Sequence, residues 1–199
     1  MSFTQTLKTK LRDPLATFKG LERTIAAVCI LIPVVLRLTD TNNNPLCHDH
    51  SGFRFSISDY VYMPAAYMFG MMLCIAAMLF IFNGAVYFRN EEPHKLNLNP
   101  NGKWYNLVLG ITLLIIIILP CKDPRYAILH DIFAGIFFLG NAFVIAFFHQ
   151  PKNRTLSITL AALTVAAMIP WLLGVYHLFY GEWLSLIVIG IHFILEARR

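Results

Sequence analysis

The chain has few charged residues. Asp, Glu, Lys and Arg make up 14% of its 199 residues, whereas they make up about 25% of a soluble domain. Apolar residues make up 57%, and the mean hydropathy is +0.61. This composition excludes a soluble globular domain, a disordered chain and a nucleic-acid-binding protein. With four cysteines the chain is not a disulfide-stapled scaffold either.

Signatures of common enzyme classes are also missing. The sequence has no P-loop, no Gly-x-Gly-x-x-Gly fingerprint, no Gly-x-Ser-x-Gly elbow and no Cys-x-x-Cys pair. We therefore expect no cofactor, and we expect a protein that is not an enzyme, although the alternatives below include one.

Long apolar runs dominate what is present. A hydrocarbon core of roughly 30 Å needs about 20 apolar residues to cross it. The sequence predicts an all-α fold, a bundle of six transmembrane helices in one domain (residues 21–199). A basic tail (residues 1–20), for which we expect an amphipathic helix or a mobile segment, comes before it and is predicted to be cytoplasmic. The predicted spans are 21–39, 60–88, 104–120, 128–149, 155–174 and 182–196.

Lys and Arg residues predict the orientation of these spans. Twelve of the 16 fall in the tail and the very start of the first span (Arg23), in the second and fourth connections and at the C-terminus. Because cytoplasmic loops carry an excess of Lys and Arg, both termini are predicted to be cytoplasmic. The protein is then a multi-pass integral membrane protein of the plasma or inner cell membrane.

Two of the four cysteines, Cys47 and Cys121, fall in predicted outward loops. If that side is oxidising, a disulfide between them would join the first outer loop to the end of the third span. The alternative is two free thiols.

Ionisable residues stand at the outer starts of the second, fourth and sixth spans: Asp59, His130 with Asp131, and Glu182. In a six-helix bundle these starts lie at one level, and their side chains can converge. Pro33, Pro64 and Pro170 in the outer halves of spans would bend the helices there and open an outward cleft. The alternative for the carboxylates is stabilisation of helix ends by the helix dipole.

Short motifs at these same positions resemble the Frag/DRAM/Sfk group of six-span membrane proteins and related bacterial membrane proteins of unknown function. The matching residues are Ile57-Ser58-Asp59 with Pro64 and Phe69, then His130, Ala134 and Phe137-Phe138, and finally Glu182-Trp183. The resemblance implies a six-span topology and work in or on the lipid bilayer, since characterised relatives are linked to lipid-anchor remodelling, phosphoinositide regulation and autophagy.

We therefore expect a lipid-related or accessory membrane protein that binds a lipid headgroup or a small polar ligand in an outward cleft. Its partners would be membrane lipids and a further membrane protein, with no nucleic acid. The predicted binding residues are Ser58, Asp59, His130, Asp131, Glu182 and Trp183.

Two alternatives use the same architecture. A zinc-dependent lipid hydrolase would hold Zn²⁺ with ligands drawn from His48, His50, His130, Asp59 and Glu182, which are side chains that suit this metal. A structural subunit of a membrane complex or a small transporter would need no such site.

Overall fold

The computed structural model describes residues 14–42, 44, 46–89, 103–148 and 154–198. Within these ranges the chain is helical and forms no β-strand, so the predicted all-α fold is confirmed. The elements in order are α2 (Pro14–Thr39), η1 (Ser58–Tyr62), α3 (Ala66–Arg89), α4 (Tyr105–Ile118), α5 (Ala127–Phe147), α6 (Arg154–Ala166), α7 (Ile169–Leu172) and α8 (Leu178–Ala197).

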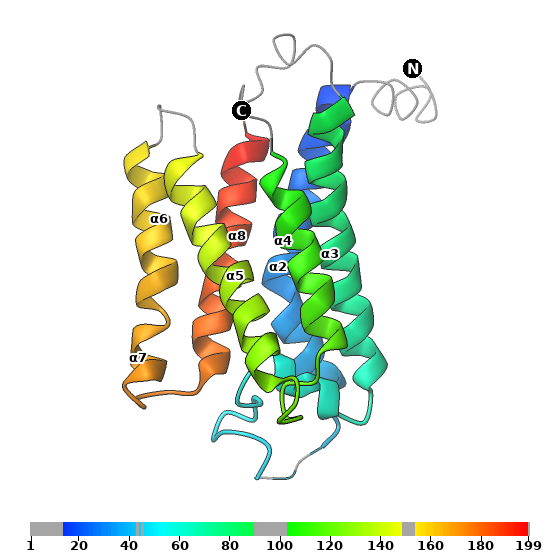
Figure 1. The fold of residues 1–199 in the computed structure, drawn as a ribbon, viewed down its shortest axis with the longest axis vertical. Coiled ribbons are helices and arrows are strands. Elements are labelled where there is room, and N and C mark those ends of the chain that lie inside the picture. The colour runs from blue at the N-terminus through cyan, green and yellow to red at the C-terminus, as the bar shows by residue number, and fades with distance from the viewer. Residues whose placement is uncertain (1–13, 43, 45, 90–102, 149–153, 199) are drawn as a thin grey trace.

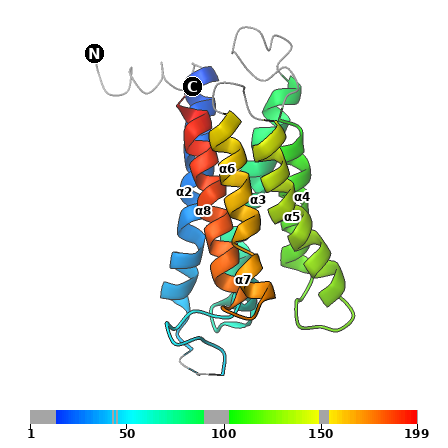
Figure 2. The ribbon, with the colours of Figure 1, turned by 90° about the vertical axis from the view of Figure 1, so that its left-hand side faces the viewer.

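The long helices form a bundle (Figures 1 and 2), and their contacts close it into a ring. Helix α2 packs against α3 and α8, α3 against α4, α4 against α5, α5 against α6, and α6 against α8. Helix α2 begins and α8 ends at one end of the bundle, which we call the terminal end. The segment that joins α2 to α3 lies at the opposite end, which we call the loop end. Helices α3, α5 and α8 all start at the loop end.

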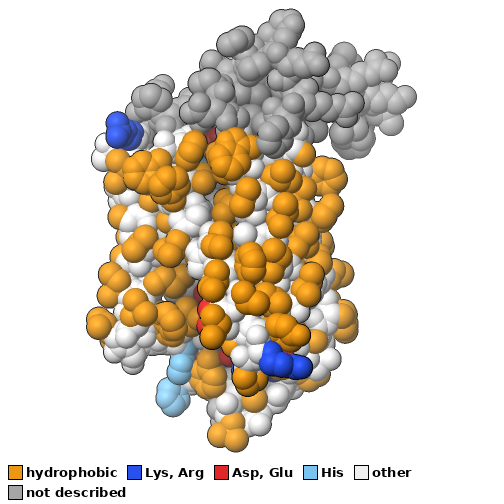
Figure 3. Space-filling model, in the orientation of Figure 1, with side chains coloured by type: hydrophobic (Ala, Val, Ile, Leu, Met, Phe, Trp, Pro, Cys, Tyr) orange, Lys and Arg blue, Asp and Glu red, His pale blue; other side chains and the backbone are white. Residues whose placement is uncertain are grey.

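Among the described residues, four helical segments are long and apolar enough to cross a membrane: Ala66–Ala85, Ala127–Phe147, Arg154–Leu172 and Leu178–Ala197. The sequence predicted six such segments, and the described residues contain four of them. Helix α4 has 14 residues and is about 21 Å long, which is shorter than a hydrocarbon core. Helix α2 has 26 residues, but it carries Glu22, Arg23 and Arg37. Hydrophobic side chains cover most of the bundle's side in Figure 3.

Helix boundaries differ from the predicted spans where proline or a tertiary contact intervenes. The predicted second span starts as the short helix η1, and Pro64 lies between it and α3. The predicted fifth span breaks after Ala166 and resumes as α7, which has Pro170 in its first turn. Residues 1–13 of the predicted tail lie outside the described residues, and α2 already begins at Pro14.

Glycines allow the closest helix contacts. A Cβ atom on Gly84 of α3 would lie 2.5 Å from the backbone nitrogen of Leu107 in α4, and one on Gly110 would lie 2.7 Å from the carbonyl oxygen of Ala77. Backbones that approach this closely are typical of helix packing in membranes. The α3–α4 pair therefore depends on having no side chain at these two positions.

Candidate functional site

The segment Ile57–Ser58, which enters η1 at the loop end, is contacted from two other helices. The backbone N–H of Ile57 donates to Oε2 of Glu182 on α8, with 2.6 Å between the atoms. The hydroxyl oxygen of Ser58 lies 2.9 Å from Nε2 of His130 on α5. Residues from three distant parts of the sequence therefore meet at this point.

His130 is held on both ring nitrogens. Its Nδ1 lies 2.8 Å from the carbonyl oxygen of Leu119, which only accepts hydrogen bonds. Nδ1 must therefore carry the proton, and in the neutral imidazole Nε2 is an acceptor. Ser58 then donates its hydroxyl proton to Nε2 and keeps its oxygen lone pairs for other partners.

Glu182 is buried, with 4% of its surface exposed. It lies in the second turn of α8 because the helix begins at Leu178, where the N–H of Phe179 donates to the carbonyl oxygen of Phe55. The prediction that Glu182 starts the sixth helix is therefore wrong. The helix dipole acts within the first turn, so it does not stabilise the carboxylate of Glu182 in the way that the alternative assumed.

A cavity of about 40 Å³ lies inside the helix ring next to these residues. Its lining comes from α2, α3, α4, α5 and α8, and from the segment Ile57–Ser58. Ser58 and Glu182 supply the polar oxygen atoms among the lining side chains. The other lining residues are Cys29, Ile32, Ile57, Leu73, Ala76, Phe80, Leu113, Ile116, Ala134, Phe137, Phe138 and Leu186. The structure thus has an apolar cavity with one polar end where the sequence predicted a cleft between helix tips.

The other predicted site residues lie elsewhere. Asp59 is in the first turn of η1, and its Oδ1 pairs with Nζ of Lys122 at 2.8 Å. Asp131 is exposed on α5. The ring of Trp183 packs against Phe53 and Phe179, with centroids 5.6 and 5.7 Å apart. Of the six predicted binding residues, Ser58, His130 and Glu182 are therefore brought together around Ile57–Ser58.

A second buried group of charges holds the segment between α2 and η1. Nε of Arg54 lies 2.6 Å from Oδ2 of Asp40, and Nε2 of His48 lies 3.0 Å from the same oxygen. Arg54 also donates from Nη1 to the carbonyl oxygen of Asp59 at 3.3 Å. Burial alone would raise the pKa of Asp40, but the hydrogen bonds from Arg54 and His48 and the charge of Arg54 outweigh it and lower this pKa.

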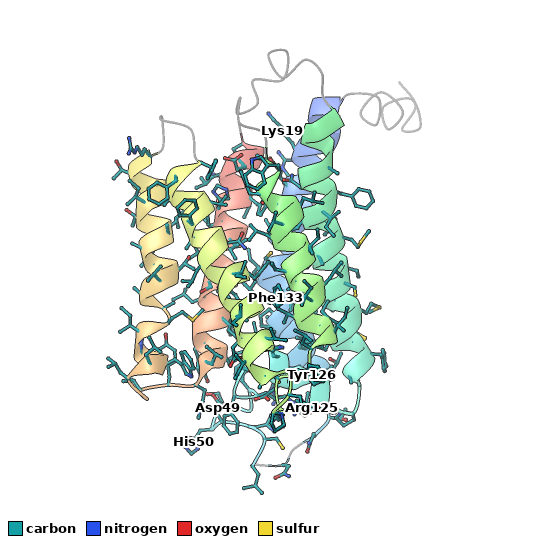
Figure 4. All side chains as sticks on the ribbon, viewed as in Figure 1. Lys19, Asp49, His50, Arg125, Tyr126 and Phe133 are labelled. Atoms are coloured by element: carbon teal, nitrogen blue, oxygen red, sulfur yellow. The ribbon has the colours of Figure 1, made fainter. Side chains whose placement is uncertain are left out.

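The residues suggested as zinc ligands do not form one group. His48 is bonded to Asp40, and His50 is exposed at the periphery of the loop end (Figure 4). Among the described residues, no three His, Cys, Asp or Glu side chains are arranged to hold a metal ion. The zinc hydrolase alternative stays a prediction.

Cys47 and Cys121 are free cysteines in the structure, and the disulfide between them stays a prediction. The Sγ atom of Cys121 lies 4.0 Å from the hydroxyl oxygen of Tyr62. Burial raises the pKa of the Cys121 thiol.

Sequence reasoning missed a cluster near the terminal end. The buried Lys103 pairs with Glu22 of α2 and with Oε2 of Glu196 of α8, the latter at 2.6 Å. Nearby helices α3 and α4 are joined by Asn106, whose Nδ2 donates to Oδ1 of Asn83 at 2.6 Å. Glu22, Lys103 and Glu196 lie near the ends of different predicted spans. The signal in the sequence that could have suggested their contact is that these opposite charges stand close to the same membrane level.

The helical ring, its apolar sides and its four membrane-length segments are those of a helical membrane protein. The chain belongs to a family of unknown function, DUF7103, which matches residues 31–197. No curated protein and no solved structure matches the chain. The resemblance to the Frag/DRAM/Sfk group therefore stays a prediction.

Proposed function

We propose that this protein binds a single-chain amphiphile, or one chain of a lipid, inside its helix ring, with the polar end of the ligand at Ser58 and Glu182. The observation that carries the proposal is the cavity, whose apolar lining ends on these two side chains. Ligand sites in proteins typically combine an apolar lining with a few convergent polar groups.

The size of the cavity limits the ligand. A cavity of about 40 Å³ has room for only a few water-sized groups, since one water needs about 10 to 15 Å³ on this measure. Only the first few carbon atoms of a hydrocarbon chain, next to its polar group, fit in this space, and the rest of the chain would extend beyond the cavity. The protein would then act as a non-catalytic lipid-binding or accessory protein.

The proposed membrane arrangement follows the charge distribution of the sequence. Helices α2 and α4 join the four longer segments in crossing the bilayer, and the terminal end faces the cytoplasm of the plasma or inner membrane. Lys103 supports a span for α2, because it neutralises Glu22 within the bundle. The bilayer thins around α4 or its ends extend to the interface, as happens around short spans.

Photo-cross-linking tests the binding. A hexadecyl probe that carries a diazirine and an alkyne is added to the purified protein in nanodiscs, and the labelled peptides are identified by mass spectrometry. We expect saturable labelling of peptides that contain lining residues such as Leu73 and Leu113. Substitution Ala134→Phe fills the cavity from α5 and should remove most of this labelling.

The matched control is Ile136→Phe, since Ile136 lies two residues further along α5 and is 42% exposed. It should leave the labelling of the cavity unchanged. Ala76→Leu fills the cavity from α3 and guards against a folding defect that is specific to Ala134→Phe. Labelling that persists in both folded cavity-filling variants would contradict the proposal.

A further inference from the structure

The polar end of the cavity offers hydrogen-bond acceptors. When the His130 ring is neutral, Ser58 donates its proton to Nε2, 2.9 Å away, and its oxygen is left to accept a hydrogen bond from a ligand. Glu182 is an acceptor through both oxygens when ionised, and one of them, Oε2, already accepts from Ile57. A ligand group that donates several hydrogen bonds and accepts none is the complement of this arrangement.

Glu182 also differs from the other buried carboxylates in its charge partners. Asp40 pairs with Arg54, Asp59 with Lys122, and Asp123 with Arg125 at the same end of the molecule. At the terminal end, Glu22 and Glu196 share Lys103. In the described part of the chain, no Lys, Arg or His forms an ion pair with Glu182. A carboxylate buried without a cation is costly, and a cation supplied by a ligand removes that cost.

Two cations next to η1, Arg54 and Lys122, are already bonded to other residues. Arg54 is occupied by Asp40 and by the carbonyl oxygen of Asp59, and Lys122 is bonded to Asp59 and lies 4.9 Å from the centre of the Tyr62 ring. A positive group at this end of the cavity would therefore have to come from a ligand.

We propose that the ligand is a long-chain primary amine, whose ammonium group bonds to Glu182 and Ser58 while the first carbon atoms of its alkyl chain contact the apolar lining. A primary ammonium carries three donors and no acceptor, and hydrogen bonds between charged groups are about twice as strong as neutral ones. This inference rests on the proposed function, because it names the headgroup of the amphiphile in the same cavity.

Competition against the hexadecyl photoprobe tests the headgroup. The competitors are hexadecylamine, hexadecyltrimethylammonium, hexadecanol and palmitate. We expect the amine to compete about tenfold or more better than the alcohol, as a charged hydrogen bond allows. The trimethylammonium compound should be weaker than the amine because it has the charge but no donor. Palmitate should compete least, because its carboxylate meets Glu182.

Glu182→Gln separates specific recognition from partitioning into the bilayer. The glutamine oxygen can still accept from the N–H of Ile57, so the variant keeps the contact that holds the segment. We expect it to bind the amine about tenfold more weakly and the alcohol almost unchanged. Ser185→Ala is the matched control on α8, since Ser185 is fully buried, bonds to the carbonyl oxygen of Gly181 and does not line the cavity.

The outcomes separate the two proposals. Equal competition by amine and alcohol in the wild type, or a preference for the amine that Glu182→Gln leaves intact, would overturn the amine assignment while binding in the cavity stands. If the hexadecyl probe does not label the cavity at all, the proposed function itself fails.

Discussion

Arg54 is almost completely buried, with 1% of its surface exposed. Its guanidinium group bonds to both oxygens of Asp40, at 2.6 and 3.3 Å, and to the carbonyl oxygen of Asp59. Asp40 follows the last turn of α2, and Asp59 is in η1, so this one side chain joins both ends of the intervening segment. Because Glu182 and His130 bind Ile57 and Ser58 of the same segment, Arg54 indirectly holds the end of the cavity in place.

Replacing Arg54 with Met should destabilise the protein strongly. The variant leaves the carboxylate of Asp40 buried without its main partner, and breaking a buried ion pair in this way costs about 3 to 5 kcal/mol. Chemical denaturation of the protein in detergent would measure the loss. The control is Arg125→Ala, which removes an exposed pair with Asp123 and should leave the free energy of unfolding unchanged.

The same pair predicts the effect of acid. The pKa of Asp40 is lowered in the folded protein, so its contribution to stability is present above the unfolded pKa of about 3.9 and is lost as the pH falls through the folded value. The wild type should lose stability below about pH 4. Asp40→Asn should show a smaller decrease over this range, and an identical acid profile for the two proteins would count against the assignment.

At the scale of elements, the contact between α3 and α4 is set by small residues. At Gly84 and Gly110 the backbones leave no space for a Cβ atom. This contact matters for the cavity, because α3 supplies Leu73, Ala76 and Phe80 to its lining and α4 supplies Leu113 and Ile116.

Gly84→Ala should therefore destabilise the bundle. The added Cβ would lie 2.5 Å from a backbone nitrogen of α4, so the helices must move apart, and overpacking of this kind costs about 1 to 3 kcal/mol. Thermal unfolding in detergent would report the change. Gly70→Ala is the matched control on the same helix, since a Cβ there meets nothing within 4 Å; if it lowered the melting temperature as much as Gly84→Ala does, close packing would not be the cause.

Some element ends follow directly from local chemistry and others do not. Pro170 predicts a disturbance in the fifth span, and α6 ends four residues before it. The early start of α8 at Leu178 has no such local signal, since it depends on the contact between Phe179 and Phe55. As a result the position of Glu182 along its helix was predicted incorrectly, although its presence at the loop end was predicted correctly.

At the scale of the whole molecule, the two ends differ in what they hold. Labelled residues in Figure 4 place Asp49, His50, Arg125 and Tyr126 at the loop end and Lys19 at the opposite end. The start of α2 and the end of α8 share the terminal end. A chain with an even number of crossings has this property, and the excess of Lys and Arg predicts which side each end faces.

Cysteine labelling tests this orientation. In a variant without the four native cysteines, Ser51→Cys at the loop end should react with a membrane-impermeant maleimide in intact cells. Arg154→Cys at the start of α6 should react only after the membrane is permeabilised. Both positions are exposed, so accessibility on the protein itself does not bias the result. Labelling of Arg154→Cys in intact cells with Ser51→Cys protected would mean that the orientation is inverted.

The sequence by itself determined the all-α fold, the presence of long apolar helices and the gathering of Ser58, Asp59, His130 and Glu182 at one end. Hydropathy is a property of consecutive residues, so it can be summed along the chain without knowledge of the fold. The same summation overestimated the number of membrane-length helices, because a run of apolar residues such as 104–120 contains a helix of only 14 residues.

Only the tertiary structure decided which of those polar side chains meet. Ser58 and His130 are 72 residues apart, and Ile57 and Glu182 are 125 apart. The rotation of each helix about its axis and the order of helices in the ring select these pairs, turn Asp59 toward Lys122 and leave Asp131 exposed. The rotation and the order of the helices are set by close packing between them, such as the contact at Gly84. This packing depends on the shapes of surfaces that are distant in the sequence, and no local pattern of residues encodes those shapes.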